Sequence, residues 1–167
     1  NNPIDFVSEE DQLRSYFQEC INKANEDVLL LGGKHEKNKG MATTLIVCHV
    51  RGHKGYILNV GDSRAYVFRG EELFQITEDH SYVNSLIKLG VITEEEAEGH
   101  HKRHVITRAL GAEDTISADF YQTNLKEGDI LLLCTDGLYS EVGVDKLRQI
   151  MYNEPQMTTL AEKLISE

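Results

Sequence analysis

Two aspartates, Asp62 and Asp136, each follow an apolar run of the length of a β-strand. Asp136 comes two residues after the run 131–134, and Asp62 lies between the runs 56–60 and 65–68. Because 131–134 is an unbroken apolar run, it predicts a strand covered on both faces, and the acid that follows would stand at the edge of a sheet. Two carboxylates placed at strand ends in this way predict one cleft with a metal site.

Each aspartate also has a simpler interpretation as a turn residue. Asp followed by Gly or Ser is common in turns, because the short side chain hydrogen-bonds to its own backbone and Gly accepts a positive φ. Taken one at a time, both residues are better explained by a turn. Their order along the chain and their surroundings favour the metal site.

The composition favours a single domain over residues 1–167 that does not bind nucleic acid. A chain of 167 residues buries roughly two thirds of the surface that it exposes when unfolded. Its 28 acidic and 17 basic residues give a net charge of −11, and the basic residues do not cluster. This argues against a surface for nucleic acid or an anionic membrane. The acidic balance suits the binding of cations.

Cysteine usage and hydropathy predict a cytoplasmic protein. Cys20, Cys48 and Cys134 lack C-x-x-C spacing and lie in apolar stretches, so we expect core thiols in a reducing compartment and no zinc site. There is no apolar run of about 18 residues and no charged-then-apolar leader. We therefore expect neither a membrane span nor a signal peptide.

Apolar spacing predicts helices near both ends of the chain and strands between them. Ser8 begins a helix whose apolar residues recur every three or four positions until Gly32-Gly33, and this face should pack on a sheet. The intervals between the first four strands are short and rich in glycine, which predicts antiparallel hairpins joined in a meander. Strands are expected at 43–50, 56–60, 65–69, 73–77, 116–124 and 130–135, and helices at 144–152 and 160–165.

Residues 80–104 predict a small helical insertion between strands. A first helix covers 81–89 and ends at Gly90, and Thr93 with Glu96 three residues later has the form of a capping box that opens a second helix. The segment is polar, and we expect it to act as a mobile flap.

Six motifs, in this order, resemble those of the metal-dependent protein serine/threonine phosphatases of the type 2C (PPM) class, in particular the compact bacterial members. The motifs are Gly40-Met41-Ala42-Thr43-Thr44-Leu45, Gly61-Asp62-Ser63-Arg64-Ala65, Thr77-Glu78-Asp79-His80-Ser81, Gly90-Val91-Ile92-Thr93-Glu94-Glu95-Glu96-Ala97, Ile106-Thr107-Arg108-Ala109-Leu110-Gly111 and Thr135-Asp136-Gly137-Leu138. Ala42 departs from the Gly that the family usually has there. Any one motif alone is weak, whereas six in family order identify the class.

The resemblance implies an α+β fold, an antiparallel β-sandwich with helices on both outer faces in α-β-β-α layers. It implies a two-metal centre at one end of the sandwich, with Asp136 as a ligand, and a third metal that Asp62 helps to hold. Residues 80–104 would be the family's flap. The cofactor would be Mn²⁺ or Mg²⁺, since carboxylates and water favour hard cations. The implied reaction is hydrolysis of phosphoserine and phosphothreonine esters by a metal-activated water, on proteins phosphorylated by an opposing serine/threonine kinase.

Part of the family's pattern is absent from this sequence. The first strand with its phosphate-binding Arg, the following Asp-Gly-Met-Gly-Gly-His-like segment and the late Asp-Asn segment do not occur. We therefore expect a sandwich that is incomplete at both ends, a fragment that is inactive alone and that self-associates through exposed sheet edges. The alternative is a catalytically dead phosphatase-like module that binds phosphoproteins or a kinase.

Other polar residues permit further readings. Gly61-Asp62-Ser63 is similar to the Gly-Asp-Ser hydrolases, with Ser63 as nucleophile, but no Asp in the chain has His three positions later, as that class requires. Arg64 or Arg108 could face a phosphate, but we expect Arg64 to orient Asp62 through a charge-assisted hydrogen bond.

The histidines do not form a convincing metal motif. His49 and His53 span a strand and a turn, where a spacing of four does not bring side chains together. His100, His101 and His104 are expected to be solvated loop residues, with His104 the one that would approach a third metal.

Overall fold

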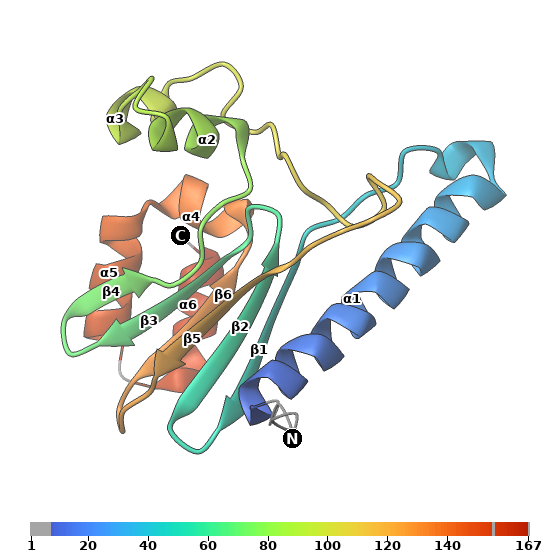
Figure 1. Ribbon diagram of the computed structural model, residues 1–167. Helices are drawn as coiled ribbons and strands as arrows, with labels where there is room; N and C mark the ends of the chain where they lie inside the picture. Colours follow the sequence, from blue (N-terminus) through green and yellow to red (C-terminus); the bar gives the residue numbers. More distant parts are fainter. Residues whose placement is uncertain (1–7, 155, 167) are drawn as a thin grey trace.

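The computed structural model describes residues 8–154 and 156–166, which form two antiparallel sheets packed face to face with helices on both outer sides (Figure 1). Within these residues one sheet has the order β1-β2-β5 and the other β4-β3-β6. The strands are β1 Leu45–Arg51, β2 Lys54–Val60, β3 Arg64–Arg69, β4 Glu72–Gln75, β5 Asp119–Asn124 and β6 Ile130–Cys134. The helices are α1 Glu9–Lys34, the 3₁₀ turn η1 Glu36–Asn38, α2 Tyr82–Lys88, α3 Glu94–Glu98, α4 Asp136–Val142, α5 Val144–Asn153 and α6 Met157–Ser166.

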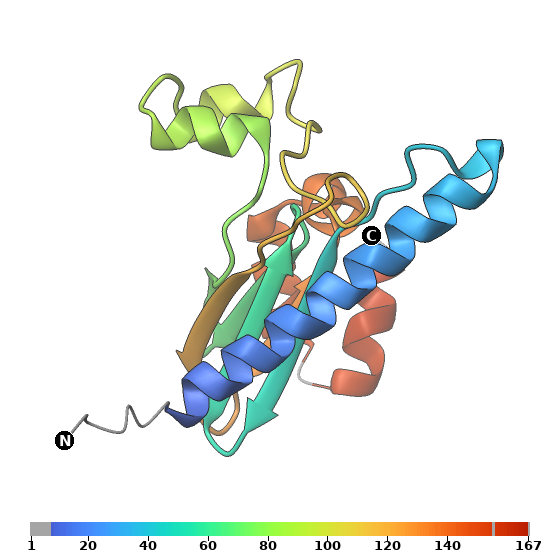
Figure 2. The same ribbon diagram turned by 45° about the vertical axis from the view of Figure 1, so that its right-hand side comes forward.

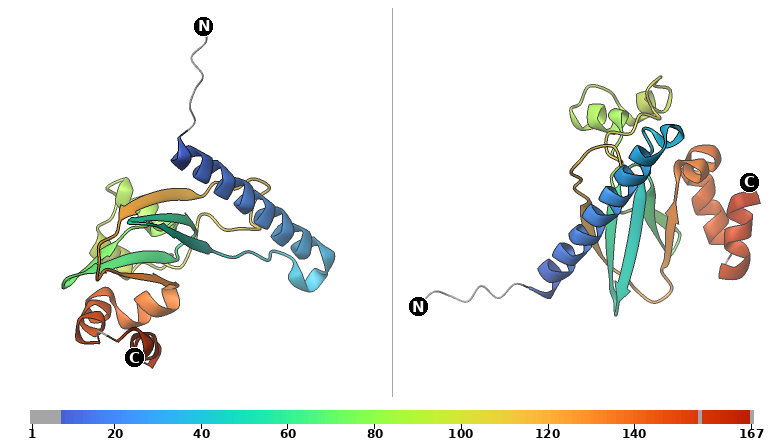
Figure 3. Two further views of the ribbon diagram at one scale, coloured as in Figure 1. Left: turned by 90° about the horizontal axis from the view of Figure 1, so that it is seen from below. Right: turned by 90° about the vertical axis from the view of Figure 1, so that its right-hand side faces the viewer.

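The layers follow the predicted order. Helix α1 lies diagonally across the β1-β2-β5 sheet (Figure 2), and α4, α5 and α6 cover the outer face of the other sheet (Figure 3). Two apolar clusters fix these contacts, one between α1 and its sheet around Ile21 and Leu58, the other between the C-terminal helices and β3 around Phe68 and Leu147. The α-β-β-α architecture is confirmed.

Helix α1 begins as predicted but ends later. The Ser8 side chain accepts a hydrogen bond from the backbone N–H of Asp11 at 3.1 Å, which caps the first turn. Gly32 and Gly33 do not stop the helix, which continues to Lys34. A glycine lowers helix stability by only about 1 kcal/mol, and the Asn38 side chain donates to the Leu31 carbonyl at 3.2 Å, so the last turn keeps a partner.

The predicted meander is wrong at one point. β1 pairs with β2 and β3 pairs with β4, both antiparallel, but β2 and β3 belong to different sheets. Residues 61–63 carry the chain from one sheet to the other in a tight connection at one end of the sandwich. Both strands are buried over most of their length because each is central in its sheet. The apolar pattern of a strand predicts that it is buried, but it does not predict which sheet the strand joins.

Strand β6 is an edge strand and is not covered on both faces as the sequence predicts. Among the described residues it pairs only with β3, and its Leu133 is 40% exposed. Only alternate residues of the run, Ile130, Leu132 and Cys134, pack against the cluster formed by Phe68 and the C-terminal helices.

The predicted core position holds for none of the three cysteines in full. Cys20 is exposed on α1, so its predicted core position is wrong, whereas Cys48 and Cys134 are half-buried; all three are free thiols. Burial raises the pKa of the Cys134 thiol to about 11.

No helix within the described residues is long and apolar enough to cross a membrane.

Replacing Asp129 by Asn is expected to destabilise the chain near neutral pH but not near pH 2. The Asp129 side chain, 4% exposed, accepts hydrogen bonds from Arg69 Nε at 2.9 Å and Nη2 at 2.6 Å. It also accepts the Lys126 N–H at 2.8 Å, and together these bonds tie β3 to the β5–β6 turn. The Arg69 bonds hold its pKa at about 2. A lowered carboxyl pKa stabilises the fold above the unfolded value of about 4, and this stability disappears as the pH falls through about 2.

The expected loss for Asp129→Asn above pH 5 is about 1–2 kcal/mol, the range of a charge-assisted pair near the surface. Urea unfolding of both proteins from pH 2 to pH 7 measures it. Glu127→Gln, an exposed neighbour in the same turn, serves as the control. A difference between wild type and Asp129→Asn that does not change with pH would contradict the assignment.

Candidate active site

The structure brings Asp62 and Asp136 to the same end of the sandwich. β3 and β6 are paired so that Arg64 lies opposite Cys134. Asp62 comes two residues before Arg64, and Asp136 comes two residues after Cys134, so the register places both acids just beyond the same end of this strand pair. Burial and then the charge of Asp136 raise the pKa of Asp62, as expected for two carboxylates that face one partly desolvated space.

Asp136 is the first residue of α4, a helix that the sequence analysis did not predict. Thr135 is its N-cap, and Asp136 stands in the first turn, where a negative charge is favourable. Tyr139, one turn further along α4, donates its hydroxyl proton to the Asp62 carbonyl oxygen at 2.9 Å. One side chain therefore ties the segment that carries Asp136 to the turn that carries Asp62.

The turn at Gly61 is fixed from several sides. Its φ is +108°, and a Cβ built there would lie 2.3 Å from Thr44 Cγ2. The Gly61 N–H donates to His80 Nδ1 at 2.9 Å, and the Gly61 carbonyl accepts from the His80 N–H at 3.0 Å and from the Asn59 side chain at 3.1 Å. Asp62 is thus presented by a backbone with little freedom.

Arg64 pairs with Asp79 and does not orient the Asp62 carboxylate as the sequence analysis expects. Its Nε donates to Asp79 Oδ1 at 2.9 Å and its Nη2 to Oδ2 at 2.7 Å, while the guanidinium lies 3.7 Å from the centre of the Tyr139 ring. The planar guanidinium satisfies both a bidentate carboxylate and an aromatic face. Arg64 therefore holds Tyr139, which in turn holds the Asp62 backbone.

Asp79 is a further acid at this end that the sequence analysis did not single out. Its charge also raises the pKa of Asp62, after the larger effects of burial and of Asp136. The signal was present in the sequence, since Asp79 precedes His80 in one of the six motifs, but turn chemistry explains an isolated Asp equally well.

The remaining candidates lie elsewhere or have other partners. Ser63 is buried, and its hydroxyl lies 2.9 Å from that of Thr44. Arg108 pairs with Asp119, Nη1 to Oδ1 at 2.7 Å. His49 lies between the rings of Phe17 and Tyr56, and His53 lies in the β1–β2 turn. The rings of His100 and His101 contact each other at a tilt, with centres 4.5 Å apart, and His104 is exposed.

The two aspartates fit part of a site for a hard divalent cation. Repulsion between Asp62 and Asp136 contributes to the raised pKa of Asp62, and a cation bound between them would relieve it. Among residues 8–154 and 156–166 no three or more His, Cys, Asp or Glu side chains are grouped as a metal site. Because Mg²⁺ takes about six oxygen ligands, this pair would supply only some of them.

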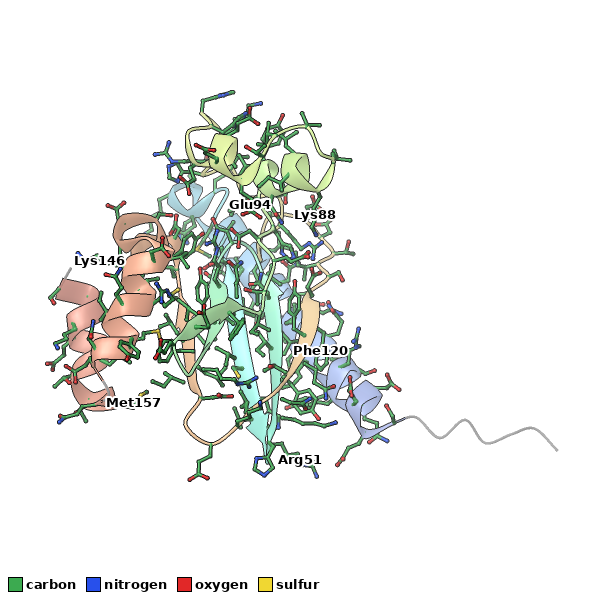
Figure 4. All side chains as sticks on the ribbon, turned by 90° about the vertical axis from the view of Figure 1, so that its left-hand side faces the viewer. Arg51, Lys88, Glu94, Phe120, Lys146 and Met157 are labelled. Atoms are coloured by element: carbon green, nitrogen blue, oxygen red, sulfur yellow. The ribbon has the colours of Figure 1, made fainter. Side chains whose placement is uncertain are left out.

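The helices predicted for the insertion are present, and they stand at the end of the sandwich that carries the aspartates. Lys88 and Glu94, in α2 and α3, lie at the end opposite Arg51 (Figure 4). The capping box of Thr93 and Glu96 is confirmed, as is the stop at Gly90, which has φ +68°. The two ends of the insertion meet in a short ladder, in which Tyr82 N–H donates to the Val105 carbonyl and Thr107 N–H to the His80 carbonyl, both at 2.8 Å.

Comparison with known proteins assigns the family. The model of the family described as protein phosphatase 2C matches residues 5–166. The protein phosphatase PhpP of Streptococcus pneumoniae strain D39 is 37% identical over 162 residues, which are 97% of this chain and 64% of that protein. The serine/threonine phosphatase stp of Listeria monocytogenes strain F2365 is 31% identical over 94% of this chain and 62% of its own length. This chain thus spans somewhat less than two thirds of either relative.

Solved structures agree with the sequence match. The serine/threonine phosphatase of S. agalactiae superposes with a TM-score of 0.88 at 31% identity, over 97% of this chain and 66% of that one. The catalytic domain of the serine/threonine protein phosphatase PstP, solved with two manganese ions, gives a TM-score of 0.81 at 29% identity, over 92% and 64% of the two chains. The chain belongs to the protein phosphatase 2C family.

Proposed function

We propose that this chain forms part of a protein serine/threonine phosphatase that hydrolyses phosphoserine and phosphothreonine esters at a two- or three-metal centre. The main support is the convergence of Asp62 and Asp136 at one end of the sandwich, where burial and mutual repulsion raise the pKa of Asp62. The names of the relatives and the two manganese ions of the PstP catalytic domain support the reaction class and the cofactor.

Asp136 would hold a Mn²⁺ or Mg²⁺ ion of this centre, and Asp62 would contribute to a further ion. When bound, such ions lower the pKa of a coordinated water and neutralise the oxygens of the phosphoryl group. The protein would supply position: Tyr139 fixes the Asp62 backbone, and Arg64 with Asp79 fixes Tyr139. The insertion 80–104 would act as a flap over bound substrate, a protein phosphorylated by an opposing serine/threonine kinase.

A full-length protein that contains this chain is expected to hydrolyse p-nitrophenyl phosphate and phosphothreonine peptides only when Mn²⁺ or Mg²⁺ is present. The metal dependence is expected because the candidate site is made of carboxylates, whereas the Ser63 hydroxyl contacts that of Thr44 and burial raises the pKa of the Cys134 thiol to about 11. Hydrolysis rates with and without chelator test it. Full activity in excess chelator would exclude the metal mechanism, and tight metal binding without hydrolysis would favour the binding module considered as the alternative.

The 167-residue chain by itself is expected to be inactive and to self-associate. Among the described residues β6 and β1 each pair on one side only, and apolar side chains such as Leu133 and Val50 are exposed on them. Unpaired strand edges form hydrogen bonds with the edges of other molecules. Light scattering over a range of protein concentrations measures the association. A monomer at high concentration that also shows metal-dependent phosphatase activity would disprove this expectation.

A further inference from the structure

Both ends of the insertion converge on a single carboxylate, Asp119, the first residue of β5. His80, the first residue of the insertion, places Nε2 3.1 Å from Asp119 Oδ2, and Arg108, four residues after its last residue, donates from Nη1 to Oδ1 at 2.7 Å. Tyr121 adds a weaker hydroxyl contact to Oδ2 at 3.3 Å. Burial disfavours the charged form of Asp119, but the hydrogen bonds from His80 and Arg108 outweigh it and lower its pKa.

The hydrogen bonds define which nitrogen of His80 carries the proton. Nδ1 accepts the Gly61 N–H at 2.9 Å, so it must present a lone pair. In the neutral ring the proton is then on Nε2, which donates it to Asp119 Oδ2. Arg108 Nη1 lies 3.0 Å from Nε2, but both are donors, and Nη1 directs its protons to Asp119 and to the Ser117 carbonyl at 3.1 Å.

His80 therefore connects the base of the insertion to the turn that presents Asp62. Its ring is largely buried, with the residue 8% exposed, and its backbone N–H and ring Nδ1 hold the two polar backbone groups of Gly61. Its carbonyl accepts the Thr107 N–H, the last rung of the ladder that closes the insertion. A movement of this ladder would move His80, and with it the Gly61 amide that precedes Asp62.

We propose that His80 is a positioning residue that couples the insertion to the Asp62 turn, and that Asp119 holds its ring in the required tautomer and orientation. Only the catalytic consequence rests on the proposed function, since the coupling is a property of the fold. Asp119 would act through His80 and Arg108 and would not itself contact a metal or substrate.

Two substitutions of His80 separate its two contacts. The side-chain oxygen of Asn occupies nearly the position of Nδ1, so His80→Asn retains the acceptor for Gly61 but loses Asp119. The terminal NH₂ of Gln reaches the position of Nε2, so His80→Gln retains the donor to Asp119 but loses the acceptor for Gly61. Amide hydrogen exchange of Gly61, Tyr82 and Thr107 in this chain reads both contacts without any requirement for activity.

For His80→Gln we expect the Gly61 amide to exchange on the order of 10-fold faster while Tyr82 and Thr107 change little, because loss of one hydrogen bond corresponds to about 1 kcal/mol. For His80→Asn we expect the Tyr82 and Thr107 amides to exchange faster while the Gly61 amide changes little. His53→Asn, in the turn at the other end of the sheet, is the control and should change none of the three. Equal effects of both His80 variants on all three amides would overturn the coupling.

In the full-length protein, the affinity for Mn²⁺ gives a second comparison of His80→Gln with His80→Asn. His80→Gln is expected to raise the Mn²⁺ concentration for half-maximal binding on the order of 10-fold, the usual effect of losing a residue that supports a metal ligand, whereas His80→Asn should stay near wild type. Equal Mn²⁺ affinities for the two variants would refute positioning of the metal turn. If the protein binds no metal at all, the proposed function fails, and the exchange pattern alone then decides whether His80 couples the two segments.

Discussion

Replacing Asp136 by Asn is expected to lower turnover of the full-length protein on the order of 100-fold or more at saturating Mn²⁺. The substitution keeps the shape of the side chain and removes the charge that would hold the cation. Residues that only support metal ligands commonly account for 10–100-fold, so a direct ligand should lie at or above that range. The apparent Mn²⁺ affinity should fall together with turnover, because both depend on the same carboxylate.

Asp62→Asn is the matched comparison for Asp136→Asn. It also removes one carboxylate from this end of the sandwich. The family resemblance implies that Asp62 would help to hold an additional metal and not the two-metal centre, so we expect its effect to be smaller. Circular dichroism of both variants would confirm that they remain folded. Near-wild-type turnover of Asp136→Asn at saturating Mn²⁺ would contradict its assignment as a ligand.

Most of the helices and strands could be predicted from local sequence patterns, because burial and helix capping require particular residue types at particular spacings. The capping box at Thr93, the N-cap at Ser8 and the apolar face of α1 each predicted what the structure contains. The passage of the chain from one sheet to the other at 61–63 has no such local sequence pattern. A strand that crosses to the facing sheet has the same period-2 pattern and the same turn residues as one that turns back beside its neighbour.

The candidate site was less predictable than the fold, because its contacts join distant segments. Asp62 and Asp136 stood out as acids after apolar runs, but the partner of Arg64 could not be read from sequence. The sequence predicted that Arg64 pairs with the neighbouring Asp62, whereas in the structure Arg64 pairs with Asp79, 15 residues away. The role of His80 could not be predicted for the same reason, since Gly61 and Asp119, which contact its ring, lie far from it in the sequence.

Gly61→Ala is expected to destabilise the chain strongly, because the added methyl group would collide with Thr44 and the backbone at Gly61 has a positive φ. A Cβ at Gly61 would lie 2.3 Å from Thr44 Cγ2 and 2.6 Å from Thr44 Cβ, and φ is +108°, which L side chains rarely adopt. Strain of this kind costs about 1–3 kcal/mol, and overpacking adds about 1–3 kcal/mol. A total of roughly 2–6 kcal/mol is a large part of the 5–15 kcal/mol that stabilises a typical domain.

Gly70→Ala is the control that separates backbone strain from collision. Gly70 also has a positive φ, +64°, but a Cβ there would meet no atom within 4 Å, so its substitution should cost only about 1–2 kcal/mol. In the Gly61→Ala background, Thr44→Ser removes Cγ2, the nearer of the two clashing atoms, and keeps a hydroxyl for Ser63. It should restore part of the loss, because the clash with Cβ and the strain at φ remain. Urea unfolding of wild type, Gly61→Ala, Thr44→Ser, the double variant and Gly70→Ala measures this coupling. A cost for Gly61→Ala no greater than that for Gly70→Ala would show that the turn before Asp62 has room to relax.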